Sequence, residues 1–137
     1  MAKIYYDKDA DLSNFDGKTI GIIGYGSQGH AHALNLKDNG QTVMVGLYPE
    51  SKSREKVTEA GLAVADVDQV VKESDVIVML IPDHLIAGVY RDSVEPHLNS
   101  KKTLGFAHGF VIHYRQGLPP AGVDVVMIAP KAPGHRM

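Results

Sequence analysis

The 137-residue chain contains no cysteine, which excludes disulfide bonds and thiolate metal sites and is compatible with a reducing compartment. Its net charge is only −2, and no block of basic residues occurs, which argues against nucleic acid or an anionic membrane as a partner. No apolar run approaches the roughly 20 residues that a membrane-spanning helix needs. The first residues also lack the apolar core of a signal peptide. We therefore expect a cytoplasmic protein.

Several common catalytic and metal-binding patterns are also missing. The sequence has no G-x-S-x-G nucleophile elbow and no Walker lysine. Among the seven histidines, His30 and His32 are two residues apart and so do not share a helix face, and the others form no zinc-ligand spacing. The sequence therefore predicts no metal ligands.

A glycine-rich motif is present near the N-terminus. An apolar run at residues 19–23, expected to be a buried strand, leads into Gly24, Gly26 and Gly29 and then into a helical pattern. In this G-x-G-x-x-G spacing the first glycine permits a tight turn, the second lets a pyrophosphate approach the backbone, and the third allows close helix–strand packing. The motif predicts a dinucleotide site, and the alternative is an ordinary tight turn.

Strands and helices are expected to alternate along the rest of the chain. Apolar or β-branched runs predict strands at residues 42–46, 62–65, 76–81, 103–107 and 123–129. Such βαβ units form parallel sheets, so the predicted fold is an α/β, Rossmann-type, doubly wound parallel sheet. Asp66 and Gln69 are expected to form a capping box for the helix that follows residues 62–65.

Four loops are expected to converge at the carboxyl ends of these strands, where ligands bind such sheets. They are the glycine loop, residues 48–53, residues 82–86, and the pair of loops carrying His108 and Lys131. His108 could act as an acid, a base or an electrostatic partner, or simply bond a loop carbonyl. Lys131 could stabilise an oxyanion, or be an ordinary solvated lysine.

The loop at residues 48–53 bears on the choice between NAD(H) and NADP(H). No acid stands at the end of the second strand, where a free ribose hydroxyl usually meets one. Ser51, Lys52 and Ser53 suit a 2′-phosphate, although Glu50 would repel it and either serine could merely cap its helix. Tyr48 could lie against adenine or be an ordinary surface residue. NADP(H) is favoured, and NAD(H) stays possible.

Together these segments resemble ketol-acid reductoisomerase, the acetohydroxy-acid isomeroreductase of valine, isoleucine and leucine biosynthesis. The matching strings are GYGSQGHAHA at 24–33, SKS at 51–53, IPD at 81–83, FAHGF at 106–110, APKAPGH at 129–135 and KIYYD at 3–7. The resemblance implies a magnesium-dependent alkyl migration in 2-acetolactate or 2-aceto-2-hydroxybutyrate, followed by NADPH reduction to the 2,3-dihydroxy acid.

The resemblance also implies roles for individual residues. His108 matches the catalytic histidine, and Lys131 matches a lysine at the substrate end. The expected cofactor-binding residues are Gly24, Tyr25, Gly26, Ser27, Gln28, Tyr48, Ser51, Ser53, Asp83, His84, Leu85, Ile86 and Gly134. The family commonly has arginine in place of Tyr48 and glycine in place of Glu50 and Ala132. The first two departures weaken the case for strict NADPH use, and the third can shift the loop that carries Lys131.

In this family an all-helical domain follows the cofactor domain and supplies the acidic magnesium ligands. Residues 1–137 are therefore expected to be a truncated N-terminal NADP-binding domain, with a sheet incomplete at its C-terminal end and the helical domain absent from this chain. Alone, such a chain would bind nucleotide without turning over acetolactate, and the full-length protein would be a homo-oligomer. The alternatives are a non-catalytic NAD(P)-binding module and a different hydroxy-acid dehydrogenase.

Overall fold

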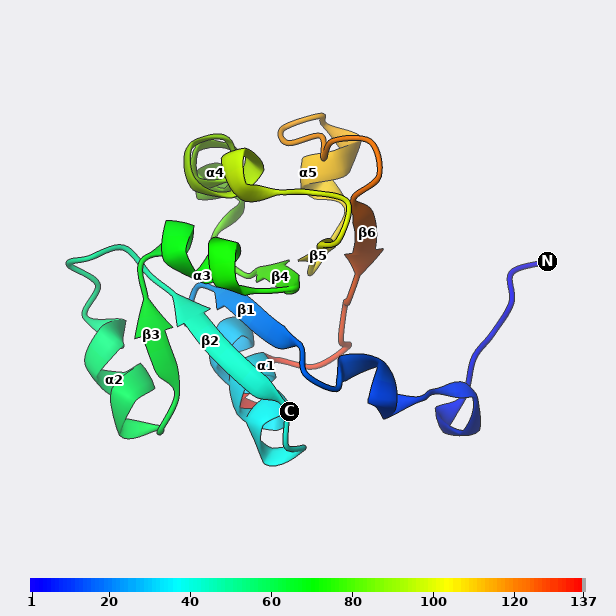
Figure 1. The fold of residues 1–137 in the computed structure, drawn as a ribbon, viewed down its shortest axis with the longest axis horizontal. Helices are drawn as coiled ribbons and strands as arrows, with labels where there is room; N and C mark the ends of the chain where they lie inside the picture. The colour runs from blue at the N-terminus through cyan, green and yellow to red at the C-terminus, as the bar shows by residue number, and fades with distance from the viewer. Residues whose placement is uncertain (137) are drawn as a thin grey trace.

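The computed structural model describes residues 1–136 and contains a six-stranded, all-parallel sheet in the order β3-β2-β1-β4-β5-β6 (Figure 1). This confirms the predicted doubly wound α/β fold. The strands are β1 (Thr19–Ile23), β2 (Thr42–Gly46), β3 (Ala63–Ala65), β4 (Val76–Met79), β5 (Thr103–Phe106) and β6 (Asp124–Met127).

Helices cover both faces of the sheet. The α-helices are α1 (Ser27–Asp38), α2 (Ser53–Glu59), α3 (Val67–Glu73), α4 (Asp83–Val89) and α5 (Phe110–His113). A π-helical turn, η3 (Tyr90–Val94), extends α4, and the short 3-10 helices are η1 (Asp7–Asp9), η2 (Leu12–Phe15), η4 (Glu95–His97) and η5 (Gly134–Arg136). None of the helices in residues 1–136 is both long and apolar enough to cross a bilayer.

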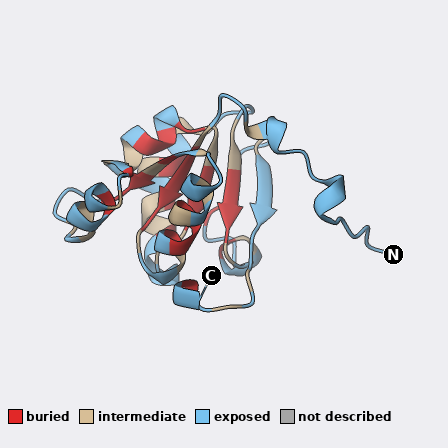
Figure 2. Ribbon diagram, turned by 90° about the horizontal axis from the view of Figure 1, so that it is seen from below, coloured by how far each residue is buried: buried red, intermediate tan, exposed pale blue. Residues whose placement is uncertain are grey.

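The buried side chains form two clusters, one on each face of the sheet. In Figure 2 the buried residues are concentrated in the inner strands and in the helices beside them. Neighbouring residues of β1 supply both clusters: Ile22 packs with residues of α1 and α2, and Ile23 packs with residues of α3, α4 and α5. Ile77 and Val78 of β4 divide in the same way. Because successive side chains of a strand point to opposite faces, continuous apolar runs are what a sheet covered on both faces requires.

The order of the strands creates a crevice above β1. β1 pairs with β2 on one side, with Ile23 opposite Gly46, and with β4 on the other side, with Ile23 opposite Met79. The chain leaves β1 toward β2 and leaves β4 toward β5, in opposite directions along the sheet. The loops that follow β1 and β4 therefore diverge. Such a topological switch point is where ligands bind in open α/β sheets.

Two local expectations were wrong. Asp66 does not cap α3 with its side chain; its carboxylate pairs with Arg54, and Gln69 bonds to Glu73 Oε1 at 3.0 Å. The strand expected at residues 76–81 ends at Met79, because the chain turns away before Pro82 to begin α4.

All four residues of β6 are exposed at the edge of the sheet.

Tyr90 predicts a loss of stability at high pH. Its side chain is buried, and its hydroxyl donates a hydrogen bond to the Leu118 carbonyl at 3.1 Å. Burial, with help from the Glu95 carboxylate, raises the pKa of Tyr90 to about 12. An unfolded tyrosine has a pKa near 10, so between these values only the folded state keeps the proton. The free energy of unfolding should therefore fall from about pH 10 to about pH 12, by up to about 3 kcal/mol.

Urea titrations at a series of pH values measure this loss, with Tyr90→Phe as the matched variant. The Phe variant keeps the ring but cannot ionise, so its stability should fall less steeply over the same interval. Equal slopes for the two proteins would contradict the assignment to Tyr90.

Candidate functional site

The three glycines after β1 have different surroundings. Gly24 has a φ of +101°, and a Cβ there would lie 2.5 Å from the Leu80 carbonyl oxygen. A Cβ on Gly29 would lie 2.4 Å from the Gly24 carbonyl oxygen. A Cβ on Gly26 would have no atom within 4 Å. Gly24 and Gly29 are thus required for packing, whereas Gly26 leaves open space in front of the backbone.

The open space lies at the N-terminus of α1. Gly26 is the residue that precedes this helix, and no side chain caps the first turn. The first N–H groups of a helix have no intrahelical partner and carry a partial positive charge. Together with the bare Gly26 backbone, they form a suitable site for a pyrophosphate.

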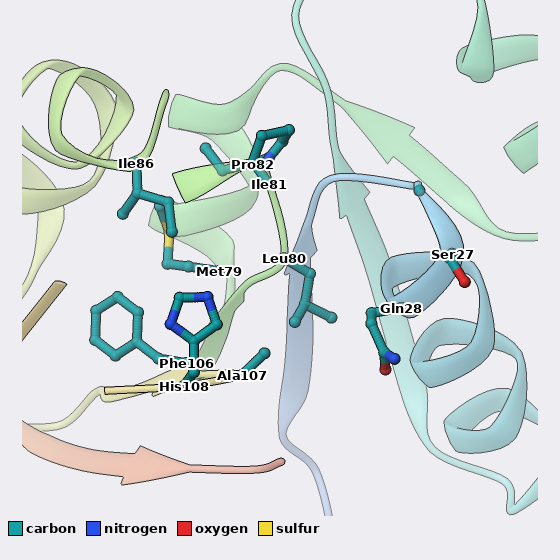
Figure 3. Close-up of a pocket in the computed structure, with 11 residues that line it drawn as sticks. Ser27, Gln28, Met79, Leu80, Ile81, Pro82, Ile86, Phe106, Ala107 and His108 are labelled. Carbon is teal, nitrogen blue, oxygen red and sulfur yellow. The ribbon is translucent and has the colours of Figure 1, made fainter. Parts of the chain in front are cut away.

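Two cavities of 320 Å³ each extend from this loop. Both include Gly26, Leu80, Ile81 and Pro82. One continues past Tyr25 toward the end of β2 and is lined there by Gly46, Leu47, Tyr48, Ser51, Ser53 and Leu85. The other continues over the ends of β4 and β5 and is lined there by Ser27, Gln28, Met79, Ile86, Phe106, Ala107 and His108 (Figure 3). Two lobes that meet at an anion site have the arrangement that a dinucleotide needs.

A third cavity, of 300 Å³, lies beside the glycine loop and has a polar lining. Its residues are Tyr25, Gly26, Ser27, His30, Ser53 and Lys56. Neither His30 nor Lys56 was expected at this site. The spacing from Ser53 to Lys56 could have indicated Lys56, because residues three apart share a helix face. Lys56 brings a positive charge to the side of the crevice where the predicted phosphate-binding serines lie.

Arg54 is occupied in holding the loop after β2. Its guanidinium donates hydrogen bonds to the carbonyls of Leu47, at 2.7 Å, and Tyr48, at 3.0 Å, and pairs with Asp66. The Ser51 hydroxyl accepts a bond from Ser53 N at 3.3 Å, so this serine also stabilises the start of α2. Capping by Ser51 and ligand binding are compatible, since a hydroxyl oxygen can accept one bond and still donate another.

His108 projects into the second cavity from the loop after β5, on the side of the crevice opposite Ser27 and Gln28 (Figure 3). Its Nε2 lies 2.7 Å from Asp83 Oδ1, and its Nδ1 accepts a hydrogen bond from Phe110 N at 3.3 Å. The structure thus brings His108, Asp83 and the glycine loop to one crevice, although these segments are far apart in the sequence.

Three predicted residues, His84, Lys131 and Gly134, do not line these cavities. Lys131 is exposed and precedes Ala132, whose carbonyl accepts a bond from Gln28 Nε2 at 3.3 Å. Gly134 is buried against the first turn of α1, where a Cβ would lie 2.0 Å from the Ser27 carbonyl oxygen. His84 is exposed on α4. Gly134 therefore packs against the backbone of Ser27 and helps to position the glycine loop. The sequence pattern did not indicate this packing role.

Two polar atoms at the crevice are buried without a hydrogen-bond partner among residues 1–136: the Tyr25 hydroxyl and Gln28 Oε1. Burial raises the pKa of Tyr25, so its hydroxyl stays neutral and can donate. Unpartnered buried groups are costly, and ribose, phosphate or carboxamide groups of a ligand would satisfy them. With the space in front of Gly26, they fit a bound dinucleotide.

The described residues do not form a comparable site for a metal ion. Within residues 1–136 no group of three His, Asp or Glu side chains lies close enough together to hold one. Magnesium prefers carboxylate and other oxygen ligands, so the described part of the chain offers it no site of its own.

Known proteins resemble this chain in sequence and in structure. Residues 14–137 match the sequence model of the family described as acetohydroxy acid isomeroreductase, NADPH-binding domain. The chain is 40% identical to an NADH-preferring ketol-acid reductoisomerase from an uncultured archaeon, with a TM-score of 0.91, covering 98% of this chain and 42% of that one.

More distant structures share the fold. An imine reductase from Myxococcus stipitatus, solved with NADP+, is 27% identical with a TM-score of 0.66, and the match covers 85% of this chain and 42% of that one. A variant of that imine reductase, solved with NAD+, is 26% identical with the same TM-score, over 86% of this chain and 42% of that one. The chain thus spans about two fifths of the length of each of these relatives.

Proposed function

This chain belongs to the acetohydroxy acid isomeroreductase family, and we propose that it is the dinucleotide-binding part of a ketol-acid reductoisomerase. The proposed reaction converts a 2-aceto-2-hydroxy acid by alkyl migration and reduction to a 2,3-dihydroxy acid. The observation that carries the proposal is the pair of cavities that meet at Gly26, with His108 at the end of one of them.

The two cavities would take the two halves of the cofactor. We place the pyrophosphate over Gly26 and the first turn of α1, and the adenosine between Tyr48 and Leu85 in the cavity that reaches the end of β2. The nicotinamide would lie in the other cavity, beside Ile86 and His108. The apolar lining of that cavity by Met79 and Phe106 would exclude water from the reacting ring.

The bound cofactor supplies a hydride, and the chain supplies the groups around the carbonyl that accepts it. We assign His108 to the developing alkoxide, where an imidazolium or a neutral N–H donor would stabilise charge or deliver a proton. Lys131 would approach the substrate from the segment beside Gln28. The alkyl migration belongs to the complete active site, because the described residues do not provide the magnesium ligands.

Within this proposal the cofactor is NADP(H), held at its 2′-phosphate by Ser51, Ser53 and Lys56. Ser53 lines both the adenosine cavity and the polar cavity that contains Lys56. Arg54 already bonds through Nε and Nη2 to the loop carbonyls and to Asp66, and it lines neither cavity, so we assign the 2′-phosphate to Lys56. In this assignment, the preference for NADP(H) over NAD(H) depends on the positive charge of Lys56.

Isothermal titration calorimetry of this chain with NADPH and NADH tests both the binding and the preference. We expect Lys56→Ala to weaken NADPH binding about 10- to 100-fold, because one charge-assisted contact is worth about 1.5–3 kcal/mol. The affinity for NADH should change by less than about twofold. Lys18→Ala is the matched control, since Lys18 is exposed immediately before β1, at the end of that strand away from the glycine loop, and it should alter neither affinity appreciably.

Two outcomes would contradict these assignments. Absence of binding for both cofactors would overturn the proposed function. Equal loss of NADPH and NADH affinity in Lys56→Ala would place Lys56 at the pyrophosphate instead of the 2′-phosphate, and tighter binding of NADH by the unmodified chain would reverse the preference.

A further inference from the structure

Two contacts hold the segment at residues 130–136 against the start of α1. Gln28 Nε2, in the first turn of α1, donates a hydrogen bond to the Ala132 carbonyl at 3.3 Å. Gly134, the first residue of η5, is buried so close to Ser27 that a Cβ there would lie 2.0 Å from the Ser27 carbonyl oxygen. Helix η5 therefore lies beside α1 (Figure 1).

The hydrogen bond to Ala132 orients the Gln28 carboxamide. The other polar atom of this side chain, Oε1, is buried and has no hydrogen-bond partner among residues 1–136. A backbone carbonyl can only accept, so the group that faces Ala132 is the NH₂ of the carboxamide. Turning the carboxamide over would break this bond and bring two oxygen atoms together. The Gln28 donor thus has a defined partner, which lies 104 residues further along the sequence.

These contacts join the part of the crevice assigned to the cofactor to the segment assigned to the substrate. Ser27 and Gln28 belong to the first turn of α1, over which the pyrophosphate is placed, and both line the cavity where the nicotinamide is placed. Lys131 is exposed and directly precedes Ala132. The position of Lys131 therefore depends on where the Ala132 carbonyl is held.

We propose that Gln28 is a positioning residue whose Nε2 holds the segment carrying Lys131 against the glycine loop. This inference rests on the proposed function, which places the cofactor over α1 and Lys131 near the substrate. When the contact is broken, the Lys131 segment and the first turn of α1 both gain freedom, and a cofactor must then order them as it binds. Gln28 in this way links the affinity for the cofactor to the placement of Lys131.

Backbone ¹⁵N relaxation of the labelled chain measures the order of this segment residue by residue. Without cofactor, the order parameters of the Ala132 and Gly134 amides should be about 0.85 in the unmodified chain and fall below about 0.6 in Gln28→Met. Methionine is unbranched and of similar length to glutamine, but it cannot donate a hydrogen bond. Unchanged order in Gln28→Met would show that the side chain only fills space, and would overturn the positioning role.

Gln116→Met is the matched control. Gln116 Nε2 also donates to a backbone carbonyl, that of Tyr114 at 3.4 Å, but its side chain is exposed and lines none of the three cavities. This variant should leave the order parameters of Ala132 and Gly134 unchanged. An equal loss of order in Gln28→Met and Gln116→Met would mean that both loosen the chain as a whole, and would remove the specific role of Gln28.

Gly134→Ala releases the same segment from a residue that lines none of the three cavities. Because the added Cβ would meet the Ser27 backbone, η5 must move away from α1. We expect the same loss of order at Ala132, and a fall of at least about fivefold in NADPH affinity by calorimetry. Lost order with unchanged affinity would overturn the link. An unmodified chain that binds neither NADPH nor NADH would instead remove the proposed function, while the order parameters still test the contact to Ala132.

Discussion

Gly26→Val should abolish dinucleotide binding while leaving the fold intact. The backbone at Gly26 is extended, with φ −79° and ψ −159°, and its negative φ does not restrict the position to glycine. The new side chain would meet no protein atom within 4 Å of its Cβ, so it would occupy the open space where the pyrophosphate is placed. We expect the affinity for NADPH and NADH to fall at least about 100-fold, or about 2.7 kcal/mol, by calorimetry.

The stability of this variant should change little. Valine is a poorer residue than glycine before a helix, so a loss of about 1 kcal/mol is expected in urea unfolding. Gly88→Val is the matched control, because a Cβ there also has no atom within 4 Å and Gly88 lines none of the three cavities; it should bind both cofactors normally. Retained affinity in a folded Gly26→Val chain would show that no phosphate passes over this residue.

Gly29→Val, in contrast, should destabilise the fold. Its Cβ would lie 2.4 Å from the Gly24 carbonyl oxygen, and this contact is with backbone that cannot rotate aside. Helix α1 would have to move away from β1, which disturbs the packing of Ile22. The three glycines of one motif thus have separable roles, as their spacing predicts, and the structure shows the contacts that cause them.

The fold was predictable because its signals are local. Each buried strand is a short apolar run, and each connection contains a glycine, a proline or a helical pattern, so the α/β alternation follows from the order of the segments. The capping box at Asp66 failed because a tertiary partner, Arg54, competes for that carboxylate. Such competition between a local motif and a distant side chain cannot be read from spacing alone.

The site was predictable only where residues follow directly from a motif. Gly24, Gly26 and Gly29 carry their roles in their spacing, and His108 was placed at a strand end by the same topology. The pairing of His108 with Asp83, and the approach of Lys56 to the glycine loop, depend on how far separate loops reach across the crevice. That reach depends on helix orientation and loop geometry, which periodicity does not specify.

The proposed catalytic role predicts that His108→Gln will slow reduction by about 10²–10⁴-fold, the usual contribution of a positioned general acid or base. The chain can be tested in place of the matching segment of the archaeal reductoisomerase, with which it aligns over 98% of its length. In this chimera, kcat for 2-acetolactate with NADPH should fall, because glutamine cannot deliver the proton at the alkoxide. NADPH affinity should change by less than about threefold, since His108 lines only the nicotinamide end of the crevice.

His113→Gln is the matched control for this substitution. His113 is exposed at the end of α5, five residues after His108 in the printed sequence, and it should leave kcat unchanged. A chimera that binds NADPH but reduces nothing, even with His108 intact, would favour a non-catalytic dinucleotide-binding module. Full activity in His108→Gln would show that the imidazole at the mouth of the second cavity takes no part in proton transfer, and that the alkoxide finds its donor elsewhere.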